Sequence, residues 1–391
     1  MNVVVSAGGR FHAHHLAYQL ALRKSLCKLF TFDYTAHDSS IPSSLVHIDR
    51  TSKLFNDYFV KLQLARFIAP AQFNVFKDNL FDRYVSKKLT SLDSFDLFVG
   101  WAHYAEKSLM IARRRGATIV IESGSCHIRE QQRILHEEYQ RWRLDYAPIN
   151  SRTITKMCNE YEHADYIMTL SSFAQRSFIA HGIAGHKVLM VPCGVDVEYF
   201  LHNRPTEAAS QPKFRVISVG LISLRKGVQY LLAAWNKLNL PKDCELILVG
   251  TMTKDFASII SRLNIPSNVT FTGPVDRSTL RMLYQQASLF VLPSLEDGFG
   301  MVIGEAMASG LSVICSTASA GPELITDGVH GLIYNAYNSK DLAEKIDWCY
   351  QHKNDLITMG KHGQQRIHAF SWDIYGNNIY QAYTKLLKDT I

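Results

Sequence analysis

The most informative stretch of this sequence, residues 293–310, reads PSLEDGFGMVIGEAMASG. It follows the apolar, β-branched run Leu289–Leu292, which predicts a strand, and it continues into a helical pattern. A glycine-rich turn between a strand and a helix lets backbone amides approach an anion at the helix N-terminus. Asp297 lies in the turn and Glu305 on the following helix, so we expect both carboxylates to face one crevice. There they would accept hydrogen bonds from two sets of vicinal hydroxyls, such as those of a ribose and a hexose.

A second strand-turn-helix pattern lies upstream of this stretch. The predicted strand Arg215–Val219 ends at Gly220, and Arg225 and Lys226 stand just before the helical pattern Gln229–Trp235. Two cations beside a helix N-terminus suit a diphosphate, because amide donors and the helix dipole add to the side-chain charge. The stretch does not contain the GxxxxGK[ST] pattern of a Walker A loop.

Short apolar runs alternate with helical patterns along most of the chain, which is typical of parallel α/β structure built twice. The 391 residues suit two domains, and the polar, proline-containing segment Leu201–Pro212 predicts the linker between them. The other predicted strands are Asn2–Ser6, Leu97–Gly100, Thr118–Ile121, Tyr166–Thr169, Val188–Val191, Glu245–Val249, Val269–Thr272, Ser312–Cys315 and Gly331–Tyr334.

The composition excludes several classes of protein. With 47% hydrophobic and 20% charged residues, the chain does not match disordered, collagen-like or coiled-coil sequences. The net charge of +7 is too diffuse for a nucleic-acid binder, but it suits an anionic small ligand or an anionic membrane surface. Seven scattered cysteines without CxxC spacing, together with the lack of a signal peptide or a membrane-spanning run, predict a cytoplasmic protein.

Two histidines follow predicted strands of the first half, where ligands gather in open α/β sheets. His103 follows Leu97–Gly100, and His127 follows Thr118–Ile121. Each could bind a sugar or a phosphate, or could instead be satisfied within the fold. The Gly8–Gly9 turn after the first strand could approach a ligand or be a structural turn. No cluster of His, Asp or Glu at ligand spacing accompanies these residues, so we predict no metal.

Residues 51–90 interleave aromatic and basic side chains. Phe55, Tyr58, Phe59 and Leu62 have helical spacing, so their stripe could pack in the core, line an acceptor groove or lie on a membrane interface. The first 200 residues also carry most of the excess positive charge, with 24 basic and 19 acidic side chains. This segment is therefore the candidate for peripheral contact with an anionic membrane.

The order of the motifs resembles that of a GT-B glycosyltransferase of retaining family 4, the glycosyl transferases group 1. The resemblance runs through almost the whole chain. It rests on the Gly8–Gly9 turn, PCGVD at 192–196, Val219-Gly220 with Lys226-Gly227, Phe271–Gly273, the stretch 293–310, Gly321–Gly331 and the segment Phe370–Trp372.

This resemblance implies two Rossmann-like domains that face each other across a cleft. Residues 1–197 would form the acceptor-side domain, with a returning C-terminal helix over 372–391, and residues 198–371 would bind the nucleotide sugar. In departures from the family pattern, Leu221 stands where an arginine is common, and Asp297 replaces the usual glutamate. Arg225 is therefore the candidate second cation.

The resemblance also implies a role for each candidate residue. Lys226 would neutralise the diphosphate, Asp297 would meet hydroxyls of the donor sugar, and His127 or His103 would replace the histidine of the first domain. We predict as catalytic Lys226, Asp297 and His127, and as substrate-binding Gly9, Gly220, Arg225, Phe299, Gly300, Met301, Glu305 and His103.

The implied reaction is transfer of a hexosyl unit from a nucleotide-diphosphate sugar to a hydroxyl, with retention at the anomeric carbon and no required metal or other cofactor. We expect a role in cell-envelope or extracellular polysaccharide or glycolipid synthesis, with a lipid-linked acceptor at the inner face of the membrane and no nucleic-acid partner. Two alternatives are a GT-B sugar-nucleotide epimerase and an inactive subunit that only binds the sugar nucleotide.

Overall fold

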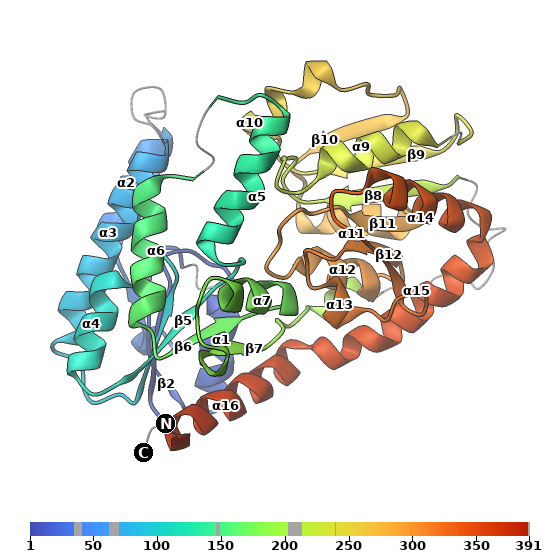
Figure 1. The fold of residues 1–391 in the computed structure, drawn as a ribbon. Coiled ribbons are helices and arrows are strands. Elements are labelled where there is room, and N and C mark those ends of the chain that lie inside the picture. Colours follow the sequence, from blue (N-terminus) through green and yellow to red (C-terminus); the bar gives the residue numbers. More distant parts are fainter. Residues whose placement is uncertain (35–40, 62–69, 146–148, 202–212, 239, 390–391) are drawn as a thin grey trace.

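The computed structural model describes residues 1–34, 41–61, 70–145, 149–201, 213–238 and 240–389. Within these residues the chain forms two parallel sheets flanked by helices (Figure 1). The first sheet has the strand order β3-β2-β1-β4-β5-β6-β7, and the second has the order β10-β9-β8-β11-β12-β13. The predicted α/β architecture is therefore confirmed.

The first sheet is built from β1 (Val3–Ser6), β2 (Leu26–Thr31), β3 (Val46–Ile48), β4 (Leu97–Trp101), β5 (Thr118–Glu122), β6 (Tyr166–Thr169) and β7 (Val188–Met190). The second is built from β8 (Arg215–Val219), β9 (Glu245–Val249), β10 (Val269–Gly273), β11 (Leu289–Leu292), β12 (Ser312–Ser316) and β13 (Gly331–Tyr334). Every predicted strand is present, and the structure also contains β2 and β3, which the sequence pattern did not predict.

The longer helices of the first half are α1 (Ala13–Leu22), α2 (Arg50–Lys61), α3 (Pro70–Leu89), α4 (Glu106–Arg114), α5 (Ile128–Arg141), α6 (Ser151–His163) and α7 (Ser172–Ala180). Those of the second half are α9 (Val228–Lys237), α11 (Arg277–Gln286), α12 (Met301–Ala308), α14 (Ser339–Gln351), α15 (Lys353–Ile367) and α16 (Trp372–Asp389). Short turns of helix are α8 (Val197–Phe200), α10 (Lys254–Ala257), α13 (Gly321–Leu324), η1 (Ser43–Leu45), η3 (Gly185–Lys187), η5 (Ile260–Arg262) and η6 (His368–Phe370).

Two segments of the chain cross between the sheets side by side. The amide of Val195 donates to the carbonyl of Phe370 at 2.8 Å, and a Cβ on Gly194 would lie 2.5 Å from the Trp372 ring. Only glycine lets the two crossings approach this closely. Beyond the second crossing, α16 returns to the first sheet (Figure 1), where Gln19 of α1 donates to Asp373 at 3.1 Å.

The two sheets draw on residues 3–190 and 215–334, which lie on either side of the predicted boundary at 197/198. The boundary itself stays a prediction, and residues 202–212 of the predicted linker lie outside the described residues.

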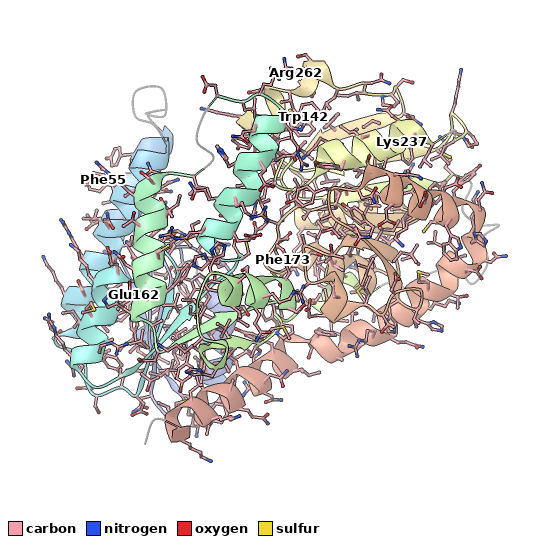
Figure 2. All side chains as sticks on the ribbon, in the orientation of Figure 1. Phe55, Trp142, Glu162, Phe173, Lys237 and Arg262 are labelled. Carbon is pink, nitrogen blue, oxygen red and sulfur yellow. The ribbon has the colours of Figure 1, made fainter. Side chains whose placement is uncertain are left out.

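Helix α5 connects the two halves, which the predicted division did not anticipate. Its first turn lies beside the first sheet, yet Tyr139 near its end is buried in the apolar core around the second sheet. Glu138 accepts hydrogen bonds from Gln229 at 3.0 Å and from the Tyr230 hydroxyl at 2.9 Å. Figure 2 shows Trp142, just past the helix, near Arg262 of the second half, which donates to its carbonyl at 2.5 Å. The halves are thus joined away from the crossings as well.

The aromatic segment 51–90 divides between the core and the surface. Phe73 and Phe81 are buried, whereas Phe55, Tyr58 and Phe76 are 46–57% exposed. The core interpretation and the surface interpretation therefore each apply to part of the segment. Side chains 59–72, including Phe59 and Leu62, lie outside the described residues. Among the described helices, none combines the length and the apolar character that a membrane crossing needs.

Candidate functional site

Lys226 and Asp297 meet at the carboxyl edge of the second sheet. Strands β8 and β11 are parallel neighbours, with Leu289 opposite Val216, so the turns that follow them lie at the same edge. The Lys226 ammonium forms an ion pair with Asp297, and the two side chains are 15% and 10% exposed. The structure thus brings together the two side chains that the sequence predicts on separate turns.

The charge state of Asp297 follows from these neighbours. Burial alone would raise the pKa of Asp297, but the positive charges of Lys226 and Arg225 outweigh it and hold this pKa below its usual value. Asp297 is therefore an anion at neutral pH, and it can accept hydrogen bonds from a sugar hydroxyl.

Arg225 is paired with a carboxylate that is not among the predicted site residues. Its Nη1 donates to Oε2 of Glu296 at 2.8 Å, and Glu296 is fully buried whereas the arginine is 29% exposed. The same carboxylate accepts from residues of the first half, the Cys126 amide at 3.0 Å and the Gln131 side chain at 2.8 Å. Arg225 thus stands where the two halves meet.

Two glycines allow the turn after β11 to take its shape. Gly300 has a φ of 81°, a left-handed conformation that favours glycine, and it caps α12. A Cβ on Gly298 would lie 2.0 Å from the carbonyl oxygen of Gly124, so this turn touches the loop after β5. Phe299 is buried between the two glycines, and Met301 begins α12 with 37% exposure.

Glu305 lies on α12, where its Oε2 accepts a hydrogen bond from the buried Tyr284 hydroxyl at 3.2 Å. Burial raises the pKa of Glu305 above its usual value, although Tyr284 and then Arg277 act in the opposite direction. Arg277 is itself paired with Asp196, next to the first crossing. Tyr284 carries no motif signal, and only its hydrogen bond to Glu305 reveals it.

The remaining predicted glycines lie at strand ends. Gly220 follows β8, and its amide donates to Val249 at 2.9 Å. Gly9 lies in the turn after β1, where a Cβ would meet the Phe11 ring at 2.9 Å. Their contacts with substrate stay predictions.

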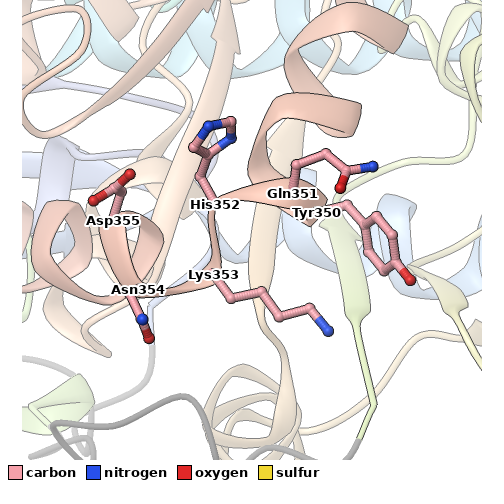
Figure 3. Close-up of a pocket in the computed structure, with 6 residues that line it drawn as sticks. All are labelled: Tyr350, Gln351, His352, Lys353, Asn354 and Asp355. Carbon is pink, nitrogen blue, oxygen red and sulfur yellow. The ribbon is translucent and has the colours of Figure 1, made fainter.

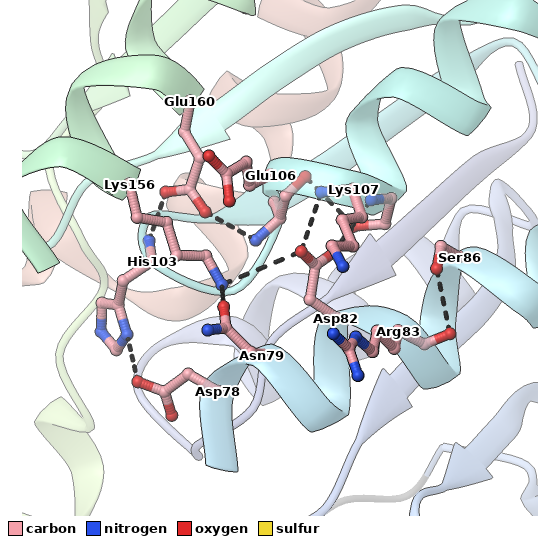
Figure 4. A network of polar contacts seen from close by, with 12 residues as sticks. Asp78, Asn79, Asp82, Arg83, Ser86, His103, Glu106, Lys107, Lys156 and Glu160 are labelled. Atoms are coloured by element: carbon pink, nitrogen blue, oxygen red, sulfur yellow. Dashed lines mark hydrogen bonds and ion pairs between the residues drawn. The ribbon is translucent and has the colours of Figure 1, made fainter. Parts of the chain in front are cut away.

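His103 belongs to a polar network in the first half (Figure 4). Its backbone has a φ of 66°, and the buried Glu160 carboxylate accepts from the amides of His103 and Ala105 at 2.5 and 2.8 Å. Burial raises the pKa of Glu160 to about 8. Asp78 lies 3.0 Å from Nδ1 of the imidazole, which is 31% exposed. His103 is therefore both held in place and open to a ligand.

His127 is placed differently. It is 4% exposed, its Nδ1 accepts from the Arg129 amide as the N-cap of α5, and its ring stacks on His181 at 4.5 Å. Burial, together with the charges of His181 and Arg129, lowers the pKa of His127 to about 4, so the ring is neutral at pH 7. This placement favours a histidine satisfied within the fold, which leaves His103 as the better candidate.

Two other features of the described residues bear on ligands. No three His, Cys, Asp or Glu side chains in the described part of the chain are grouped so that they could hold a metal ion, and a reaction without metal stays a prediction. A surface hollow where α14 meets α15 is lined by Tyr350–Asp355 (Figure 3). None of the predicted site residues lines this hollow.

Comparisons with known proteins identify chains that this one resembles. Residues 202–366 match the family model described as Glycosyl transferases group 1. The chain is 26% identical over 226 residues to the MMP alpha-(1->4)-mannosyltransferase of Mycolicibacterium hassiacum. This aligned stretch covers 56% of this chain and 54% of that protein. The chain is also 26% identical over 246 residues to the serotype-specific mannosyltransferase WbdA of Escherichia coli, covering 59% of this chain and 30% of the relative. The matched stretches are thus about half of the first relative and less than a third of the second.

The fold itself is shared with solved structures. HepE of Anabaena, solved in complex with UDP, superposes with a TM-score of 0.68 at 18% identity, covering 98% of this chain and all of that one. The architecture is that of the GT-B glycosyltransferases. The predicted resemblance to the glycosyl transferases group 1 is confirmed, with the family match spanning residues 202–366.

Proposed function

We propose that the protein is a retaining glycosyltransferase that moves a hexosyl unit from a nucleotide-diphosphate sugar to a hydroxyl acceptor. The observation that carries this proposal is the placement of Lys226 and Arg225 beside Asp297 at the carboxyl edge of the second sheet. Cations and turn amides stabilise a diphosphate leaving group, and a carboxylate binds sugar hydroxyls. The mannosyltransferase relatives and the UDP complex of HepE support a nucleotide-sugar donor.

In the proposed reaction the glycosidic bond to the β-phosphate breaks and negative charge grows on that phosphate. Lys226, Arg225 and the amides after Gly298 would stabilise this charge, while Asp297 and Glu305 would hold the sugar and the ribose. For retention, the acceptor would attack from the face that the diphosphate leaves, and a phosphate oxygen would take its proton. His103 would contact the substrate from the first half of the chain.

A donor screen tests this function and separates it from the alternatives. We expect one of UDP, GDP, ADP and dTDP to raise the melting temperature of the protein by several degrees, because a ligand at 100 times its Kd stabilises by about 2.7 kcal/mol. The matching nucleotide sugars are then incubated with the protein alone and with candidate acceptors. Epimerised sugar without acceptor would establish the epimerase, and binding without turnover would establish the inactive subunit.

We also propose that the acceptor is lipid-linked and that the protein works at the inner membrane face in polysaccharide or glycolipid synthesis. The exposed apolar side chains Leu54, Phe55, Tyr58 and Phe76 support this proposal, because all four lie on the helices α2 and α3 of the basic, aromatic segment. Exposed apolar and basic side chains on one surface favour an anionic interface.

Flotation with anionic liposomes at low salt tests the membrane contact. Replacing Lys53, Lys61 and Arg66 together by glutamine should lower vesicle binding by roughly a hundredfold, because each basic contact is worth about 1 kcal/mol. The matched control replaces the exposed lysines Lys242, Lys340 and Lys353 of the second half, which should leave binding unchanged. Wild-type protein that stays wholly in the unbound fraction would contradict the membrane contact and leave the glycosyltransferase proposal intact.

A further inference from the structure

The fully buried carboxylate of Glu296 receives hydrogen bonds from both halves of the molecule. Its Oε1 accepts from the Cys126 amide, and its Oε2 accepts from the side chains of Gln131 and Arg225. Cys126 and Gln131 belong to the loop after β5 and to the first turn of α5, whereas Arg225 belongs to the turn after β8. A single carboxylate thus holds hydrogen bonds to both halves at once.

A buried ion pair contributes little net stability to a contact between two surfaces, because desolvation costs several kcal/mol per ion. Apolar side chains of similar volume can replace such a pair with little loss of stability. The position of Glu296 suggests what the charge does instead. It is bonded to Arg225 and precedes Asp297, whose partner is Lys226. The contact between the halves therefore acts on the proposed diphosphate site.

In this structure the Glu296 carboxylate divides its two oxygens between the halves. The Cys126 amide bonds to one oxygen, Gln131 shares the other with Arg225, and the guanidinium is bonded through Nη1. A guanidinium has five N–H donors, so donors remain for phosphate oxygens. If the two halves moved apart, the bonds from Cys126 and Gln131 would be lost, and both oxygens would become available for a bidentate pair with the arginine.

We propose that Glu296 is a positioning residue that couples closure of the cleft to the placement of Arg225 against the donor diphosphate. This inference rests on the proposed function. Gln131 is the partner through which the coupling can be tested, because it contacts Glu296 through its side chain and lies outside the group of residues that would touch the donor.

The test is a double-mutant cycle between Gln131→Met and Arg225→Met, with Gln140→Met, an exposed glutamine on the same helix, as the control. Calorimetry measures the Kd of UDP, GDP, ADP and dTDP and of their monophosphates. We expect Gln131→Met to weaken binding of the preferred diphosphate about tenfold, the effect of losing a charge-assisted hydrogen bond. We expect the monophosphate to bind within about twofold of wild type, because Arg225 would act on the second phosphate.

The coupling predicts that Gln131→Met causes no further loss of diphosphate affinity once Arg225 is replaced. The inference would be overturned if the losses of diphosphate affinity of the two single variants multiplied in the double variant. It would also be overturned if Gln131→Met weakened diphosphate and monophosphate binding equally. A merely structural role of Gln131 would give one of these two results. If Gln131→Met does not fold, as judged by circular dichroism and melting temperature, Gln131→Ala takes its place. Wild-type protein that binds none of the four diphosphates would overturn the proposed function, and this inference with it.

Discussion

Replacing Lys226 by alanine is expected to lower kcat by roughly a hundredfold to a thousandfold, the range seen when one preorganised donor to a developing charge is removed. Donor affinity should change much less. In the structure the Lys226 ammonium is already paired with Asp297, so a bound diphosphate must compete with that carboxylate. As the glycosidic bond breaks, the growing charge makes the phosphate a stronger partner for the lysine than Asp297 is. Lys226 therefore stabilises the transition state more than the bound ground state.

Steady-state kinetics and calorimetric donor binding separate these effects. The matched control is Lys237→Ala, a lysine on the adjacent helix α9 that donates to Ser339 at 3.0 Å. A Lys226→Ala enzyme with raised KM and unchanged kcat would show that the lysine binds ground state and transition state equally. The substitution should also raise the pKa of Asp297, because Lys226 and Arg225 together offset its burial. The acid limb of the pH–activity profile would then move to higher pH.

The strands of this protein differ in how well their sequences predict them. Buried parallel strands read as continuous apolar runs, and β4 and β5, which are buried at every position, were predicted for that reason. Strand β2 carries Lys28 in its middle, and β3 consists of three residues without a buried position. Neither has the continuous apolar pattern, and only pairing with a neighbouring strand reveals them.

Local spacing was sufficient for the two turns of the second sheet and insufficient for contacts between the halves. The strand-turn-helix pattern places Lys226 and Asp297 each in the turn after a strand, and only the pairing of β8 with β11 brings the two turns together. By contrast, the bond between Cys126 and Glu296 joins positions 170 residues apart, and no motif marks Gln131. His127 shows the same limit. The sequence pattern predicts a ligand at the loop that follows β5, but the His127 ring in this loop stacks on His181, the residue that caps the end of α7.

The second large effect is expected for Glu305→Ala, which should weaken donor binding about 10- to 150-fold because a charge-assisted hydrogen bond of about 1.5–3 kcal/mol is lost. The fold should survive, since the hydrogen bond that Glu305 accepts comes from the Tyr284 hydroxyl of the same half. The matched control is Glu344→Ala, an exposed glutamate paired with Lys340, which should bind donor as wild type does.

The electrostatics of Glu305 add a pH dependence that distinguishes a role in binding from a role in packing. Burial raises its pKa, and the ionised form is the better acceptor for ribose hydroxyls. Donor affinity should therefore fall as lower pH protonates Glu305, and the fall should begin at a higher pH than it would for a glutamate with an ordinary pKa. Glu305→Gln should remove that dependence while keeping the side-chain volume. A Glu305→Gln protein that binds donor as tightly as wild type at pH 7 would place the ribose elsewhere. If the carboxylate were needed only for packing, Glu305→Gln would lower the melting temperature. The donor affinity of the wild-type protein would then be the same at pH 7 and at lower pH.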